Sequence, residues 1–176
     1  MSARAPTDGW PYITLEVNGI PLPFKHLAMP GARRNLKNAL VLAQAEGLEL
    51  VQAATAEGAT DHDRAQVERA TLLIEGSVGA YLMPLWAGPR MPTQDKVEAD
   101  EAAEPADLHF KGADHKEAAG LAFAADLCES YGVAFEHLAQ CVRILSDVTA
   151  PGARDPSGKE VAEVVRVFPV QREALI

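Results

Sequence analysis

Residues 72–86 read LLIEGSVGAYLMPLW, the stretch that decides the fold. Apolar residues occupy nearly the whole circumference of a helix drawn through it, which is typical of a helix buried on all sides. We expect this helix to end at about Met83, because Pro84 cannot continue it. Gly76 and Gly79 lack a Cβ atom and would let another backbone approach closely. The stretch therefore predicts a central buried helix in a mostly helical domain.

A β-hairpin is predicted at the start of the chain. Two short apolar runs, near 12–17 and 20–24, flank Asn18-Gly19, and Asn-Gly suits a type I′ turn in which both central residues have positive φ. The second run contains two prolines, which cannot donate to a β-ladder, so we expect it to be an edge strand or a short one.

Helical periodicity begins at Gly31. One face of that helix is predicted to hold Leu36, Leu40, Ala43, Leu50 and Ala54. Gly47 weakens the helix and leaves two readings of the following LELVQAA segment, a second helical piece or a strand; we expect the helix. Thr60 or Asp61 is suited to cap the start of the central helix.

The second half of the chain begins with an acidic segment. Residues 88–112 are predicted to be a Pro-containing linker, mobile or extended, because 95–107 holds six acids against one lysine. Helices are expected at about 114–130 and 134–148. The β-branched VVRVFPV near the C-terminus is predicted to form a strand, placed beside the hairpin.

Together these elements predict an α+β domain that is mostly α, with an N-terminal hairpin, a helical core of about four helices and a C-terminal strand or arm. Residues 1–11 are expected to be a flexible tail. The rest divides into 12–87 (hairpin plus two long helices), the linker 88–112, and 113–176 (helical pair plus C-terminal strand). We expect 12–176 to form one domain.

Composition excludes several classes of protein. Hydrophobic residues make up 48% of the chain, enough for a core, and two cysteines do not suggest a disulfide scaffold. The N-terminus has no apolar signal sequence, and 72–86 is too short to span a bilayer. The net charge of −9 disfavours nucleic acid and anionic membranes as partners. We therefore expect a soluble, cytoplasmic protein.

Basic charge is concentrated near the N-terminus. Residues 1–40 hold five basic residues against two acidic ones, a balance of +3 that leaves −12 for the remainder. Arg33, Arg34 and Lys37 crowd the first turns of a helix, the end where its dipole favours anions. Either they point into water or they meet an anionic partner. That partner could be a phosphate, or the acidic segment 95–107 of the same or a neighbouring copy.

The end of the central helix offers a second candidate contact surface. Tyr81, Met83, Leu85 and Trp86 follow one another closely there, and a chain this small has limited room to bury such a helix. Two readings stay open for this group. It belongs to the core, or part of it faces another protein.

Residues 127–145, LCESYGVAFEHLAQCVRIL, have the outline of a helix-turn-helix, with Gly132 at the turn. DNA affinity comes mainly from cations, however, and residues 113–149 contain only Lys116 and Arg143 against six acids. A structural helical corner is therefore the preferred interpretation, and a DNA-binding regulator is the alternative.

Metal and catalytic sites are poorly supported. His137 and Cys141 have the i,i+4 spacing of two ligands on one helix face, but a tetrahedral site needs two more. His62 and His115 each lie among acids at predicted helix starts, where acids are favoured for capping alone. We expect no metal, no cofactor and no catalytic residue, with a small metal- or His-dependent hydrolase as a further alternative.

The layout resembles one family. The ITLEVNGIPLPFKHL opening (13–27), the helical body, the YLMPLWAGPRMP stop (81–92) and the acidic stretch after it are similar to the small tail-assembly chaperones of long-tailed bacteriophages. The resemblance covers about the first hundred residues, and the later helical pair and strand are not part of it. It implies a helical, non-enzymatic protein that coats the tape-measure protein while the tail grows.

From these observations we expect a non-enzymatic structural or assembly protein that acts through protein–protein contacts, in bacteriophage particle assembly. Its partners would be copies of itself, another protein, or both, in the host cytoplasm or the virion. The residues expected to make the contacts are Arg33, Arg34, Lys37, Tyr81, Met83, Leu85 and Trp86.

Overall fold

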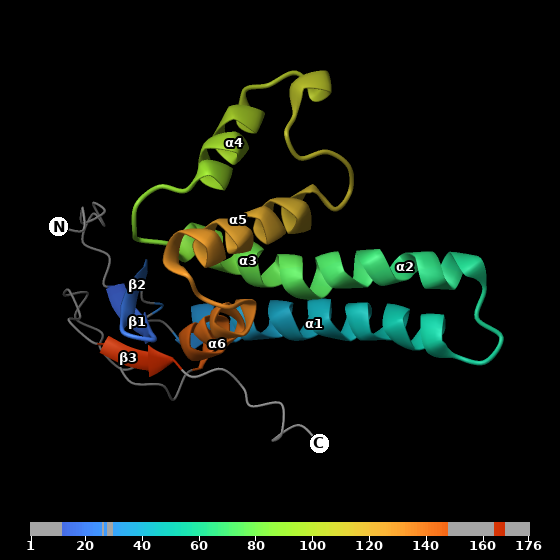
Figure 1. The fold of residues 1–176 in the computed structure, drawn as a ribbon, viewed down its shortest axis with the longest axis horizontal. Helices are drawn as coiled ribbons and strands as arrows, with labels where there is room; N and C mark the ends of the chain where they lie inside the picture. The colour runs from blue at the N-terminus through green and yellow to red at the C-terminus, as the bar shows by residue number, and fades with distance from the viewer. Residues whose placement is uncertain (1–11, 26, 28–29, 148–163, 168–176) are drawn as a thin grey trace.

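The computed structural model describes residues 12–25, 27, 30–147 and 164–167. A small sheet and a group of helices form a body. Two helices, at residues 30–55 and 61–71, extend from it side by side, and we call this extension the arm (Figure 1). The fold is mostly α with a small β part, as the sequence predicts. The predicted flexible tail at 1–11 lies outside the described residues.

The N-terminal hairpin is confirmed. Strands β1 (Tyr12–Val17) and β2 (Ile20–Lys25) pair antiparallel. Between them Asn18 and Gly19 have φ values of 52° and 81°, as a type I′ turn requires. The sheet order is β2-β1-β3, so the proline-containing β2 is at an edge, as predicted. The third strand, β3 (Val164–Val167), lies parallel to β1, which confirms the C-terminal strand beside the hairpin.

Helix α1 (Pro30–Thr55) runs through Gly47 without interruption, so the helical interpretation of the segment after Gly47 is correct. A Cβ atom at Gly47 would lie 2.5 Å from Cγ1 of Ile74. This glycine therefore serves close packing between α1 and the helix beside it and does not end the helix. Leu40 and the other residues of the predicted inner face are buried or half-buried.

The central helix begins at Asp61, with Thr60 as its cap. The Thr60 hydroxyl accepts from the Asp63 amide (3.1 Å), and the Asp63 carboxylate accepts from the Thr60 amide (2.9 Å). Helix α2 (Asp61–Thr71) continues through a π-helical turn, η1 (Leu72–Gly76), into α3 (Ser77–Leu82). A 3₁₀ turn, η2 (Met83–Leu85), follows at Pro84. The predicted end near Met83 is confirmed, whereas the π turn was not foreseen.

Helix α5 (His115–Tyr131) crosses the central helix at its glycines. A Cβ atom on Gly79 would lie 1.7 Å from the carbonyl oxygen of Gly120, and one on Gly76 would lie 2.4 Å from that of Glu117. The two backbones are therefore in direct contact, as the glycines at 76 and 79 predict. Phe123 of α5 is fully buried beside this crossing.

The predicted corner after α5 is present. Gly132 adopts the left-handed conformation (φ 65°, ψ 30°), and its amide donates to the carbonyl of Cys128 (2.9 Å). Helix α6 (Phe135–Ser146) follows and packs against α1 and α3. Its inward residues join those of the sheet in one core, with Leu15, Phe24, Leu82, Leu138 and Leu145 among the most buried.

The expectation of an extended linker over 88–112 is wrong for much of its length. Residues Pro92–Glu101 form helix α4, and Pro105–Asp107 form a 3₁₀ turn. Pro92 suits the first turn of a helix, and the Gln94 side chain accepts from the amide of Met91 (2.8 Å). After the helix, the Asp100 carboxylate accepts from the amides of His109 (2.7 Å) and Phe110 (3.0 Å), which fixes the loop.

Candidate protein-contact surfaces

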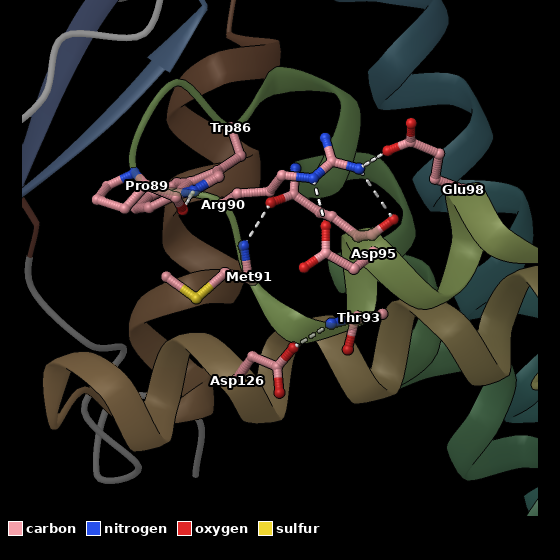
Figure 2. A network of polar contacts seen from close by, with 9 residues as sticks. Trp86, Pro89, Arg90, Met91, Thr93, Asp95, Glu98 and Asp126 are labelled. Carbon is pink, nitrogen blue, oxygen red and sulfur yellow. Dashed lines mark hydrogen bonds and ion pairs between the residues drawn. The ribbon is translucent and has the colours of Figure 1, made fainter.

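The four residues predicted as an aromatic and apolar patch, Tyr81, Met83, Leu85 and Trp86, are buried to different degrees. Trp86 is 6% exposed, and its ring lies edge-on to Phe24 (5.4 Å between centroids), Tyr131 (5.7 Å) and Phe123 (6.4 Å). Its indole nitrogen donates to the carbonyl of Pro89 (2.7 Å; Figure 2). Trp86 therefore joins β2 to α5 inside the body, and the core interpretation applies to it.

The other three residues of this patch are half-buried. Tyr81, Met83 and Leu85 pack against the core. Burial raises the pKa of the Tyr81 phenol, with a smaller contribution from Glu117, and Lys116 lies 5.6 Å from the centre of its ring. Met83 also lines a cavity of about 590 Å³ between α3, α4 and α5, whose walls are mostly apolar. These side chains do not form a continuous exposed surface.

Arg33 lies in the interior, contrary to both readings of the basic group. It is 1% exposed, and its guanidinium donates to the carbonyls of Leu27 and Asp147. It ties the start of α1 to the end of α6, because Asp147 directly follows that helix. Arg34 and Lys37 are exposed, so these two cations remain candidates for a contact with another molecule.

The acidic segment does not meet these cations within one chain. Helix α4 packs on α5, and α5 separates it from the central helix. It therefore lies on the side of the body away from α1 (Figure 1). Several of its acids are already used. Arg90 donates to Asp95 (2.5 Å) and Glu98, and the Asp126 carboxylate accepts from the amide of Thr93 (2.9 Å), which holds α4 on α5 (Figure 2).

The most exposed apolar side chains lie elsewhere, on the arm. Val41, Leu42 and Leu48 of α1 are 52%, 71% and 53% exposed, and Val67 of α2 is 43% exposed. The three α1 residues, with the exposed Ala45 between them, lie on the helix face opposite the one that packs on α2. We call Val41, Leu42, Ala45 and Leu48 the outer face of α1.

Sequence reasoning missed this outer face. The inner stripe containing Leu36, Leu40 and Ala43 is enough to explain the helical periodicity, so the periodicity alone does not point to a second apolar face. A usable signal was present, because Val41 and Leu48 are seven residues apart and Ala45 lies between them at the spacing of one helical face. A second apolar face on one helix indicates a second contact.

The helical corner offers little to DNA. Of the possible base contacts on α6, His137 is buried, and its Nδ1 pairs with the amide of Ala134 (3.1 Å) at the start of the helix. Glu136 and Arg143 are exposed, one anion and one cation. The side chains presented to solvent therefore do not form a basic surface that could neutralise phosphates.

The candidate metal and catalytic residues are not brought together. No group of three or more His, Cys, Asp or Glu side chains suitable for a metal occurs among the described residues. Burial raises the pKa of the Cys141 thiol to about 12, which disfavours the thiolate that binds metals or attacks substrates. His62 and His115 are exposed at the starts of α2 and α5, where His115 Nδ1 lies 3.0 Å from the carbonyl of Gly112.

Comparison with known protein families, with characterised proteins and with solved structures found no match. The likeness to tail-assembly chaperones therefore stays a prediction. None of the helices that the structure describes is both long enough and apolar enough to cross a membrane.

Proposed function

We propose that the protein is a non-enzymatic assembly protein that acts through protein–protein contacts. The observation that supports this most is the outer face of α1, where Val41, Leu42 and Leu48 are all more than half exposed. Burying a leucine or valine fully is worth about 1.5–3 kcal/mol, so a partner that covers three such side chains gains substantially. Contiguous apolar side chains on an exposed helix are typical of contact surfaces.

The shape of the arm supports the same proposal. Among the elements that the structure describes, α2 accompanies α1 near its far end, and the opposite side of α1 faces outward there (Figure 1). Binding of a helix along an apolar helical face is a common mode of recognition. The resemblance to tail-assembly chaperones supplies the setting in which we place this activity, the assembly of a bacteriophage particle, where a long helical partner would be covered during growth.

The proposal is tested by photo-crosslinking in the cells where the protein is naturally made. A photoreactive amino acid replaces Leu42 in one variant and Glu104 in a control, since both residues are exposed but Glu104 lies in the acidic segment, away from the outer face. We expect covalent protein adducts at position 42 and few or none at position 104. Adducts at neither position, or equally at both, would overturn the proposal.

A further inference from the structure

The charges on the exposed side of α1 are arranged by sign. Arg34 and Lys37 are exposed before the outer face, near the N-terminus of α1. In its second half, Glu46 is exposed between Ala45 and Leu48, and Glu49 is exposed directly after Leu48. Within the part of the chain that the structure describes, none of these four side chains belongs to an ion pair. The exposed side of α1 is thus basic at one end, apolar in the middle and acidic towards the other end.

We propose that a second copy of this chain docks on the outer face, with the two α1 helices antiparallel. This inference rests on the proposed function and names the partner. A two-fold axis between Leu42 and Ala45 sets Leu42 of one copy against Ala45 of the other, with Val41 and Leu48 of both copies within one helical turn of this pair. The same axis brings Lys37 within one helical turn of the partner's Glu49, because positions pair at equal distances from the axis.

The charge pattern selects the antiparallel orientation. A parallel pair would set Arg34 and Lys37 against their own copies and the two glutamates against theirs, with repulsion at both ends. An antiparallel pair sets each basic end near an acidic half. The antiparallel pair is also a closed dimer that recruits no third copy through this surface, because each copy uses the same surface to bind the other.

A contact between the basic end and the acidic segment of another copy fits the structure less well. Asp95 and Glu98 already bind Arg90, and Asp100 holds the loop at His109. That contact would join two surfaces on different sides of the body, the start of α1 and helix α4 (Figure 1). It would also leave Val41, Leu42 and Leu48 uncovered.

The test uses two charge-reversal variants of the full chain, Arg34→Glu/Lys37→Glu and Glu46→Lys/Glu49→Lys. Sedimentation at low and moderate salt measures the dimer dissociation constant of each. We expect a wild-type dimer, a dissociation constant at least about tenfold higher for each variant alone, and recovery when the two are mixed, because basic ends then meet acidic ones again. Salt should reduce these differences.

A matched control reverses two exposed acids away from the arm, Glu129→Lys/Glu136→Lys, and should leave the dissociation constant unchanged. Circular dichroism checks that every variant is folded, and the recovery on mixing shows that each retains a competent surface. If the arm variants have the same dimer dissociation constant as the wild type, the antiparallel pairing is overturned. It is also overturned if the control variant raises the dissociation constant as much as the arm variants do.

The outcomes separate this inference from the proposed function. A wild-type chain that stays monomeric while position 42 crosslinks to a different protein overturns the second copy as partner and leaves the assembly function standing. Self-adducts at position 42 together with recovery on mixing support both. A monomer without adducts at position 42 overturns both.

Discussion

The body and the arm differ in the exposure of their apolar side chains, which are buried in the body and partly exposed to solvent on the arm. In the body, the backbones of α3 and α5 touch at Gly79 and Gly120, and Trp86 is enclosed by three aromatic rings. On the arm, α1 has one face on α2 and presents Val41, Leu42 and Leu48 to solvent. The difference shows that a helix covered on one side can still carry a second apolar face, which is then available to another molecule.

The largest loss of stability is expected when the Trp86 side chain, at the centre of the body, is removed. Trp86→Ala loses ring contacts to Phe24, Phe123 and Tyr131, and such truncations of buried aromatic residues cost about 3–5 kcal/mol. Urea unfolding followed by circular dichroism measures the loss. A change below about 1 kcal/mol would mean that Trp86 is not enclosed in solution.

Gly79→Ala tests the backbone contact itself. The new Cβ atom would lie 1.7 Å from the carbonyl oxygen of Gly120, so α3 and α5 must move apart, at a cost of about 3 kcal/mol. The control is Gly31→Ala in α1, where an added Cβ meets nothing within 4 Å. This control should be neutral or slightly stabilising in the same unfolding assay. Equal effects of the two substitutions would contradict the direct contact.

The buried thiol of Cys141 in the body should make the free energy of unfolding depend on pH. Burial raises the pKa of Cys141 from an ordinary 9.0 to about 12, so between these values the unfolded chain loses the proton first. Stability should therefore fall as pH rises above 9, by at most about 1.4 kcal/mol per pH unit from this group. Unfolding at pH 8 and pH 10 of wild type and Cys141→Ala measures it. Identical pH dependence in both proteins would contradict the burial.

The smallest effect on stability is expected on the arm. Leu42→Gln replaces a side chain that is 71% exposed, so unfolding of the dilute protein should change by no more than about 0.5 kcal/mol. The same substitution should weaken self-association, measured by light scattering, because it removes apolar area from the outer face. A large loss of stability in the dilute protein would show that Leu42 is covered within the chain.

Local signals explain what could be predicted. Asn18-Gly19 fixed the hairpin turn through its backbone preference, and Gly76 and Gly79 indicated a close crossing before its partner, α5, was known. The burial of Arg33 could not be predicted in this way, because its acceptor at Asp147 lies 114 residues away in sequence.

Helix α4 escaped prediction for a similar reason. Its composition is acidic and contains proline, which is typical of a linker, yet the helix is stabilised by capping at Met91 and by the bond from Thr93 to Asp126 on α5. The outer face of α1 was missed although it is local, since one stripe of periodic residues already explained why the segment is helical.

The most direct test of the outer face is a hydroxyl-radical footprint of the wild-type chain, dilute and at high concentration. Oxidation of Val41, Leu42 and Leu48 should fall as the protein associates, while that of the exposed Val67 on α2 and the half-buried Met83 in the body should stay constant. Unchanged oxidation of the outer face in associated protein, with protection elsewhere, would contradict its role as the contact surface.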